Sequence, residues 1–264
     1  MTSGAAGRLP VLFLGHGSPI NAIEDNPWSR AFRALAAGLP RPRAVLCVSA
    51  HWFVPATLVA ADPRPDTIHD FSGFPPELEA VRYPAPGDPA LAHRVVELLG
   101  APRAATAGDR GLDHGAWSVL LHLFPAADVP VVQLSVHQRL APEVHLALGR
   151  ALAPLRDEGV LVLGSGNVVH NLGYAMRAWR AGDDSTPAWA TSFDATVARA
   201  AAARDGDALA RALESEEGRR SHPTPDHYLP LLYAVGAAGG AGAVRFPITG
   251  FDLGSLSMRA VRFD

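Results

Sequence analysis

Hydrophobic residues along the chain form short continuous runs that alternate with amphipathic stretches rich in Ala and Leu. The continuous runs predict buried strands, and the amphipathic stretches predict helices. Strands are expected at 10–16, 43–52, 129–136 and 160–169, with two more in the tail at 244–263. Helices are expected at 26–40, 88–100, 141–159 and 225–239, with one or two more across 192–217. This alternation is typical of an α/β fold in which helices flank a central, mostly parallel or mixed sheet.

Two of the predicted helices have clear start and stop signals. Asn26 and Pro27 open the first helix, and Gly38 follows its last turn. Asp88 precedes Pro89 at the start of the second, which stops at Gly100. An Asn or Asp side chain caps free backbone N–H groups, and proline suits the first helical position. Because no repeat or linker interrupts the pattern, we expect one domain over 1–264, with residues 1–9 flexible.

The segment 61–87 breaks the alternation, since it is rich in proline and has little periodicity. Long ordered loops of this kind often serve as lids or binding loops. A plain surface excursion would look the same in the sequence, and the pattern does not separate the two interpretations.

Three of the strand-like runs end at a histidine. The first run ends at His16 between two glycines, the second at His51, and the run 160–169 at His170. In an open parallel sheet, ligands bind beyond the carboxyl ends of the strands. We therefore expect these three side chains to share one site, although a single such histidine is more often structural.

Neutral imidazole is a common ligand for zinc, iron, copper and nickel, so the shared site is a candidate metal centre. His114, His222 and His227 are further candidates from other segments, and His69 lies in the proline-rich loop, where it can face a substrate. The glycines of "GSGN" at 164–167 fit neither a phosphate-binding loop nor a serine-hydrolase elbow.

The overall composition narrows the classes of partner and location. Hydrophobic residues make up 48% of the chain and charged residues 19%, with a net charge of −3, so neither nucleic acid nor an anionic membrane is an expected partner. No stretch approaches the roughly 18 apolar residues of a membrane span. The single cysteine, Cys47, excludes a disulfide framework, and with no secretory signal at the start we expect a cytoplasmic protein.

Eight motifs in order resemble one family over nearly the whole chain. They are "LFLGHGSP", "VSAHWF", "TIHDFSGFP", "YPAPGDP", "GLDHGAW", "GSGNVVHNL", "TPDHYLPLLY" and "GSLSM". Together they resemble the DODA-type extradiol aromatic ring-opening dioxygenases, the DOPA-dioxygenase-like branch of the class III, LigB-like family. The resemblance implies an α/β fold with a mononuclear metal site.

The family's functional residues map onto this chain one by one. The resemblance implies that His16, His51 and His227 bind the metal. His170 matches a histidine assigned either as acid/base catalyst or as a further ligand. His114 matches a residue of the pocket with a catalytic or substrate-contacting role, and we add His69 and Asn171 as substrate-contacting candidates. His222 is not part of the core motif.

The reaction that the resemblance implies is the insertion of O₂ beside the two hydroxyls of a catechol, which opens the ring to a muconic semialdehyde. The expected metal is Fe(II). A site of three histidines is less anionic than the common site of two histidines and one carboxylate, and it also accepts Zn(II). DOPA or another catechol is the expected substrate, and a monomer or small homo-oligomer is the expected assembly.

Two other functions remain open at the level of the residues. A zinc hydrolase would use the same histidines to activate water, with His170 or Asp226 as the base. A non-catalytic metal-binding protein would need no convergence of several histidines on an open pocket. Only the family resemblance separates the dioxygenase from the hydrolase.

Overall fold

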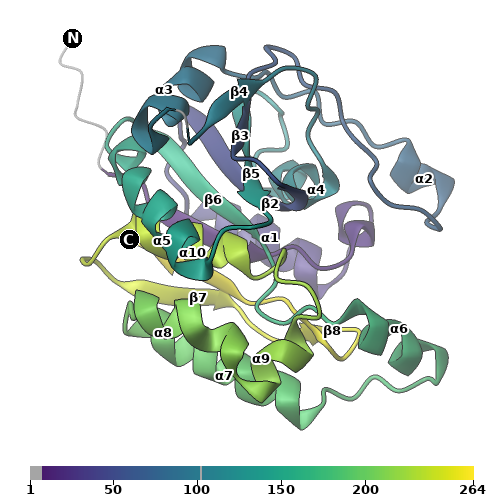
Figure 1. Cartoon of the computed structure of the whole chain (residues 1–264). Coiled ribbons are helices and arrows are strands. Elements are labelled where there is room, and N and C mark those ends of the chain that lie inside the picture. Colours follow the sequence, from purple (N-terminus) through teal and green to yellow (C-terminus); the bar gives the residue numbers. More distant parts are fainter. Residues whose placement is uncertain (1–7, 102) are drawn as a thin grey trace.

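The structure, a computed structural model, describes residues 8–101 and 103–264, and it is built on one eight-stranded sheet. The strand order is β4-β3-β5-β2-β6-β1-β10-β7 (Figure 1). The strands are β1 (Val11–Gly15), β2 (Ala44–Val54), β3 (Leu58–Ala60), β4 (Ala105–Ala107), β5 (Val131–His137), β6 (Val160–Gly166), β7 (Val244–Ile248) and β10 (Ala260–Phe263). The short strands β8 (Phe251–Asp252) and β9 (Leu256–Ser257) form a separate pair.

The centre of the sheet is parallel and its edges are mixed. Strands β5, β2, β6 and β1 run parallel to one another, while β10 pairs antiparallel with both β1 and β7. On the other side, β3 is antiparallel to β5 and parallel to β4. The predicted mostly parallel or mixed sheet is therefore confirmed.

Helices cover both faces of the sheet. They are α1 (Pro27–Ala37), α2 (Pro76–Glu79), α3 (Pro89–Leu99), α4 (His114–Leu123), α5 (Pro142–Ala151), α6 (Leu172–Arg180), α7 (Ala188–Ala202), α8 (Gly206–Arg211), α9 (Glu216–Ser221) and α10 (Leu229–Ala238). Short 3-10 turns lie at η1 (Pro19–Ala22), η2 (Ala153–Arg156) and η3 (Ala212–Glu214). Figure 1 shows α5 and α10 in front of the sheet and α1 behind it.

Alternating side chains of the central strands fill two separate hydrophobic cores. On β1, Val11 and Phe13 join the core under α3, α5, α7, α8 and α10, while Leu12 and Leu14 join the core under α1 and α4. All four side chains are fully buried. A strand that is apolar on both faces belongs in the middle of a covered sheet, as the continuous hydrophobic runs predict.

The predicted helix ends are confirmed. The side chain of Asn26 caps α1 by accepting from the backbone N–H groups of Trp28 and Ser29, and Gly38 is its C-cap. Asp88 caps α3 in the same way, and Gly100 ends that helix at a φ of 82°. The loop 61–87 contains only the single turn of α2 as a helix.

Three strand predictions differ from the structure. His51 does not end its strand, because β2 continues to Val54 across a register shift between Val48 and Phe53. Strand β6 ends at Gly166, before His170 rather than next to it. The tail forms four short strands in place of two, since residues 249–259 fold away as the β8–β9 pair.

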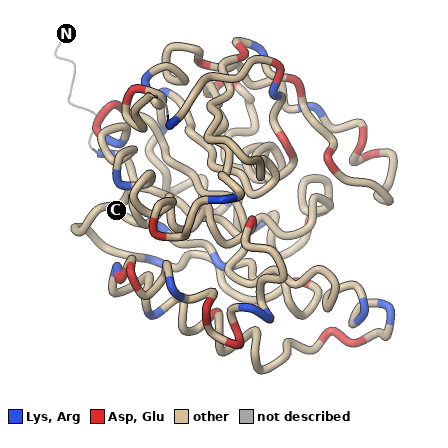
Figure 2. Tube along the Cα trace, in the orientation of Figure 1, with Lys and Arg blue, Asp and Glu red and all other residues tan. Residues whose placement is uncertain are grey.

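The expected flexible stretch 1–9 falls mostly outside the described residues, which begin at 8. Leu9 is buried and its backbone N–H donates to the carbonyl of Arg156, so this residue is anchored. Basic and acidic residues are interspersed around the described part of the molecule (Figure 2). None of the helices in that part has the length and hydrophobicity that crossing a bilayer requires.

Candidate metal centre

Five histidines from distant segments lie side by side at one edge of the sheet. His16 follows β1, His51 lies within β2, His114 begins α4, His170 follows β6, and His227 precedes α10. The ring centroids of successive neighbours in this cluster are 3.5–5.7 Å apart. The structure thus brings together the residues that the sequence singled out.

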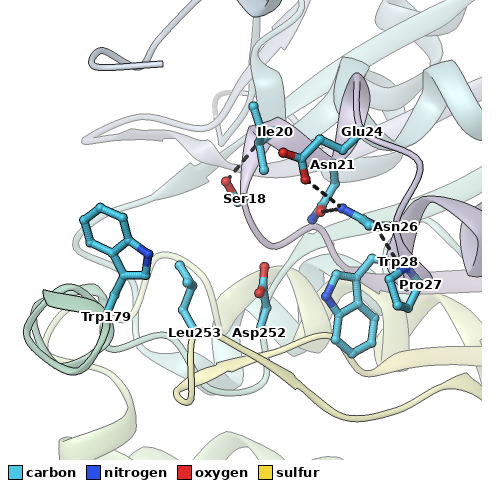
Figure 3. A pocket seen from close by; sticks show the side chains of 10 residues that line it. All are labelled: Ser18, Ile20, Asn21, Glu24, Asn26, Pro27, Trp28, Trp179, Asp252 and Leu253. Carbon is cyan, nitrogen blue, oxygen red and sulfur yellow. Dashed lines mark hydrogen bonds between the residues drawn. The ribbon is translucent and has the colours of Figure 1, made fainter. Parts of the chain in front are cut away.

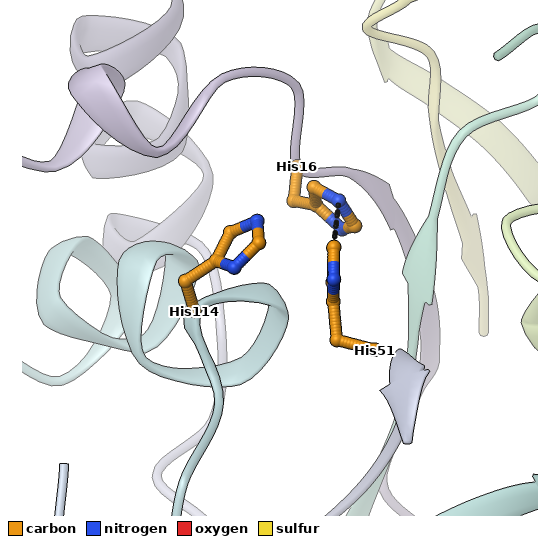
Figure 4. A group of neighbouring side chains, drawn as sticks. All are labelled: His16, His51 and His114. Atoms are coloured by element: carbon orange, nitrogen blue, oxygen red, sulfur yellow. Dashed lines mark hydrogen bonds between the residues drawn. The ribbon is translucent and has the colours of Figure 1, made fainter. Parts of the chain in front are cut away.

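Two different sets of three histidines could bind one metal ion, depending on whether nitrogen atoms or ring centroids are compared. The ligand atoms of His16, His51 and His114 all lie within 4.8 Å of one another (Figure 4). The ring centroids of His16, His51 and His227, in contrast, form a nearly equilateral triangle with sides of 5.0, 5.2 and 5.0 Å. The rings of His51 and His114 are closer, at 3.8 Å.

The Nδ1 atom of His16 is committed to a hydrogen bond that points away from the cluster. It lies 3.0 Å from the hydroxyl oxygen of Ser165 on β6. Because that hydroxyl donates its own proton to the carbonyl of Gly115, its oxygen accepts from His16. The proton of the neutral His16 ring therefore sits on Nδ1, and Nε2 keeps its lone pair.

A single carboxylate, that of Asp70, lies beside the Nδ1 atoms of two more histidines. Its Oδ1 accepts from the Nδ1 of His114 at 2.9 Å, and its Oδ2 lies 3.3 Å from the Nδ1 of His51. Burial opposes ionisation of Asp70, but hydrogen bonds with His114 and the positive charge it can bear outweigh this and lower the pKa of Asp70. His114 therefore carries its proton on Nδ1 and presents an unprotonated Nε2.

The Nε2 atoms of His16 and His51 face each other at hydrogen-bonding distance, 3.2 Å apart (Figure 4). The lone pair of His16 Nε2 points toward His51 in this contact. Two imidazole nitrogens bound to one metal at about 2.1 Å, with an angle of about 100°, would be separated by about 3.2 Å. The spacing of the two nitrogens fits a divalent cation bound between them.

His227 is oriented by its own neighbour in the chain, since its Nδ1 pairs with the carboxylate of Asp226. On one side its ring is covered by His170, which is stacked on it with centroids 3.5 Å apart and planes inclined by 2°. His227 is buried, whereas His170 is half-buried. His170 therefore lies at the more accessible flank of the cluster.

Burial lowers the pKa values of His16, His51, His170 and His227. The pKa of His51 and that of His170 fall to about 4, and those of His16 and His227 fall well below their ordinary value. Neighbouring imidazoles lower these values further, since a second positive charge nearby is unfavourable. These four rings are consequently neutral near pH 7, which is the form that binds a metal.

Two glycines allow backbone to pass close behind the ligands. A Cβ on Gly15 would lie 2.5 Å from the carbonyl oxygen of Ser257, and one on Gly166 would lie 2.1 Å from that of His227. Since real Cβ atoms do not approach an oxygen so closely, any larger residue would displace these segments. Gly17, next to His16, has a φ of 64°, a conformation that L-residues rarely adopt.

The other predicted site residues lie near the cluster but are engaged elsewhere. His69 packs against Phe71 and Trp117, and its Nε2 lies 3.0 Å from the carbonyl of Val81. Asn171 caps α6 with its side-chain oxygen and donates its amide to the carbonyl of Arg220. Substrate contact by either residue stays a prediction.

Sequence reasoning missed Asp70 as part of the centre. The motif "TIHDFSGFP" contains this aspartate, but no periodicity or spacing links it to His51 or His114. Only the path of the loop 61–87 brings it there. Asp226, in contrast, is visible in the sequence as the direct neighbour of His227.

A cavity of about 460 Å³ adjoins the segment that follows His16 (Figure 3). Asn21 lines it and also reaches back to the carbonyl of His16 at 3.5 Å. Trp28, Trp179 and Leu253 supply apolar walls. The cavity thus lies beside the segment that positions His16, although none of the clustered histidines lines it.

The fold and the histidine centre agree with comparisons against known proteins. The family model described as "Catalytic LigB subunit of aromatic ring-opening dioxygenase" matches residues 10–254. A relative from Escherichia coli (strain K12) named 4,5-DOPA dioxygenase extradiol is 49% identical over 97% of this chain and 94% of its own. A relative of the same name from Beta vulgaris is 37% identical over 96% of each chain.

A solved structure supports the same assignment. The crystal structure of an uncharacterized protein from Escherichia coli K12 matches with a TM-score of 0.85 and 44% identity, covering 97% of this chain and all of the other. The chain therefore belongs to the LigB family of aromatic ring-opening dioxygenases. Within it, the expected place in the extradiol, DOPA-dioxygenase-like branch is confirmed, as is the expectation of a ring-cleaving oxidoreductase.

Proposed function

We propose that this protein binds one divalent metal ion at the histidine cluster and cleaves a catechol by extradiol insertion of O₂. Fe(II) is the expected metal of the active enzyme, and Zn(II) also fits the same site. DOPA or a related catechol is the substrate, and a muconic semialdehyde is the product. The names of the relatives, each a 4,5-DOPA dioxygenase extradiol, support this choice of substrate.

The observation that supports metal binding best is the 3.2 Å spacing of the Nε2 atoms of His16 and His51. His16 carries its proton on Nδ1, so its Nε2 lone pair is directed at this position. This arrangement is typical of imidazoles prepared for a cation.

We assign His227 as the third ligand. Three imidazoles bound to one metal at about 2.1 Å would have ring centroids about 5 Å apart. The triangle of His16, His51 and His227 has this spacing. His114 is too close to His51, at 3.8 Å between centroids, for both rings to take ideal positions on one ion, so it contacts the substrate in this proposal.

Bound at this site, Fe(II) would supply Lewis acidity to the catechol oxygens and a redox path between the ring and O₂. His170 acts as the general base, because its neutral imidazole lies at the accessible flank of the cluster. It accepts a hydroxyl proton from the catechol and returns it during ring opening. His114, whose ring lies next to that of His51, orients the catechol.

The aromatic side chains near His114 help to exclude water. Phe71 from the loop 61–87 lies edge-on to His114 at 5.5 Å and also contacts Phe74 and Trp117. An apolar wall beside the substrate protects the reactive intermediates from hydrolysis. This is a specific role for the proline-rich loop, in agreement with the binding-loop interpretation.

The direct test uses protein purified without oxygen and loaded with Fe(II). Addition of DOPA or catechol should consume O₂ and form a yellow ring-opened product. His16→Ala should abolish both, whereas the exposed His93→Ala should not, which controls for loss of a histidine alone. Absence of O₂ uptake with every catechol tested, together with stoichiometric bound zinc, would overturn the dioxygenase and favour the hydrolase.

A further inference from the structure

One carboxylate lies behind two of the clustered histidines. The Oδ1 atom of Asp70 accepts from both the backbone N–H and the Nδ1 of His114, each at 2.9 Å, and Oδ2 faces the Nδ1 of His51 at 3.3 Å. The Asp70 side chain is 23% exposed, and the side chains of His51 and His114 are 19% and 7% exposed. The carboxylate is thus held on the side of both rings that is opposite to Nε2.

The loop around Asp70 is fixed rather than free. The backbone N–H of Ile68 donates to the carbonyl of Leu112, and the backbone N–H of Leu112 donates to the backbone carbonyl of Asp66, each at 2.7 Å. The indole of Trp117 donates to the carbonyl of Ile68 at 2.8 Å. These bonds tie the loop 61–87 to the start of α4, so Asp70 approaches the histidines in one defined position.

We propose that Asp70 is a positioning residue that fixes the Nδ1–H tautomers of His51 and His114 and directs their Nε2 atoms into the centre. This inference rests on the proposed metal-dependent function. A proton on the Nε2 of His51 could be donated to His16 at 3.2 Å, but it would leave two acceptors, Nδ1 and the Asp70 carboxylate, facing each other at 3.3 Å. Because a carboxylate only accepts hydrogen bonds, Asp70 favours the Nδ1 proton on both rings. Tautomers of metal-binding histidines are commonly set in this way.

Asp70 also supplies charge that the three-histidine centre lacks. Neutral imidazoles leave a divalent cation uncompensated, whereas a carboxylate ligand would neutralise part of its charge. Asp70 faces the Nδ1 side of the His51 ring, so it provides a negative charge near the site without occupying a coordination position. Carboxylates behind ligand histidines increase the basicity of the ring nitrogen that faces the metal.

The substitution Asp70→Asn should affect His51 and His114 differently. The amide oxygen can keep both bonds to His114, but the amide N–H₂ then faces the Nδ1 of His51 as a donor. His51 should therefore switch to the Nε2–H tautomer, which cannot bind a metal through Nε2, while His114 should not switch. Asp70→Ala removes both contacts and serves as the second variant.

Long-range ¹H–¹⁵N NMR of the metal-free protein reports these tautomers directly, and Zn²⁺ titration against a chelator reports the affinity. Asp70→Asn should move His51 alone to Nε2–H and weaken Zn²⁺ binding about 10- to 100-fold. The matched control is Asp66→Asn in the same loop, because the Asp66 side chain makes no hydrogen bond to the described residues. A similar thermal midpoint in both variants shows that the effect is not unfolding.

The inference is overturned if His51 keeps its tautomer in Asp70→Asn, or if Zn²⁺ affinity in both Asp70 variants stays within twofold of the Asp66→Asn value. Neither readout depends on ring opening. If wild-type protein binds Zn²⁺ and the tautomer switches, yet no catechol is cleaved after Fe(II) loading, Asp70 keeps its role and the proposed function fails. If the Fe(II)-loaded protein cleaves a catechol but the tautomer of His51 is unchanged in Asp70→Asn, the proposed function stands and the role of Asp70 fails.

Discussion

His170 is stacked face to face on His227, with ring centroids 3.5 Å apart and the planes inclined by only 2°. The Nδ1 of His227 pairs with the carboxylate of Asp226, whereas the backbone N–H of His170 donates to the carbonyl of Ser221. The stack places a half-buried imidazole directly beside a buried one. Two neighbouring rings can thus serve different purposes, one for the metal and one for the proton.

His170→Ala should leave metal binding nearly intact and stop turnover. Loss of a general base lowers kcat by roughly 10²- to 10⁴-fold, since proton transfer then depends on water. Metal content by mass spectrometry and O₂ uptake on the same sample separate the two effects. An equal loss of metal and activity would make His170 a ligand instead of the base.

His227 and His114 should differ in the same assay. His227→Ala is expected to remove the metal, as is His16→Ala, because each supplies one corner of the centroid triangle. His114→Ala should retain the metal and raise the KM for the catechol. If instead His114→Ala loses the metal and His227→Ala keeps it, the ligands are the three whose nitrogens lie within 4.8 Å.

Gly166→Ala should damage the centre without changing any ligand. Its Cβ would lie 2.1 Å from the carbonyl oxygen of His227, so the segment before α10 must shift. We expect weaker metal binding and a loss of stability of about 1–3 kcal/mol, measured by chelator competition and urea unfolding. Gly108→Ala is the control, because a Cβ there meets no described atom within 4 Å.

Acid should destabilise the protein partly through His145, which lies outside the metal centre. Burial lowers the pKa of His145 to about 4, and its Nε2 has no hydrogen-bond partner among the described residues. The unfolded chain has a pKa near 6.5 and therefore binds the proton first as the pH falls from about 6.5 to 4. The contribution of His145 to the free energy of unfolding is therefore complete above about pH 6.5. It decreases as the pH falls toward 4, and about 2–3 kcal/mol is lost at pH 4.5.

The measurement is urea unfolding of metal-free protein at pH 7.5 and 4.5. His145→Gln should reduce the difference between the two pH values by that amount, whereas the exposed His93→Gln should leave it unchanged. An undiminished difference in His145→Gln would show that His145 titrates normally in the folded protein.

Local sequence patterns were sufficient for much of the fold. The continuous apolar runs identify the central strands because both faces of the sheet are covered, and the caps at Asn26 and Asp88 mark helix starts because their side chains bond the adjacent backbone. The edge strands β3 and β4 are absent from that prediction. They are three residues each, too short for a period to be visible.

The strand pattern alone predicts that His16 and His170 meet, since the strands that precede them end at the same edge of the sheet. The arrangement of the side chains around them depends on tertiary contacts. The continuation of β2 past His51, the stack of His170 on His227 and the arrival of Asp70 all depend on segments far apart in the chain. Proton positions and ring orientations follow from such contacts, and no local pattern encodes them.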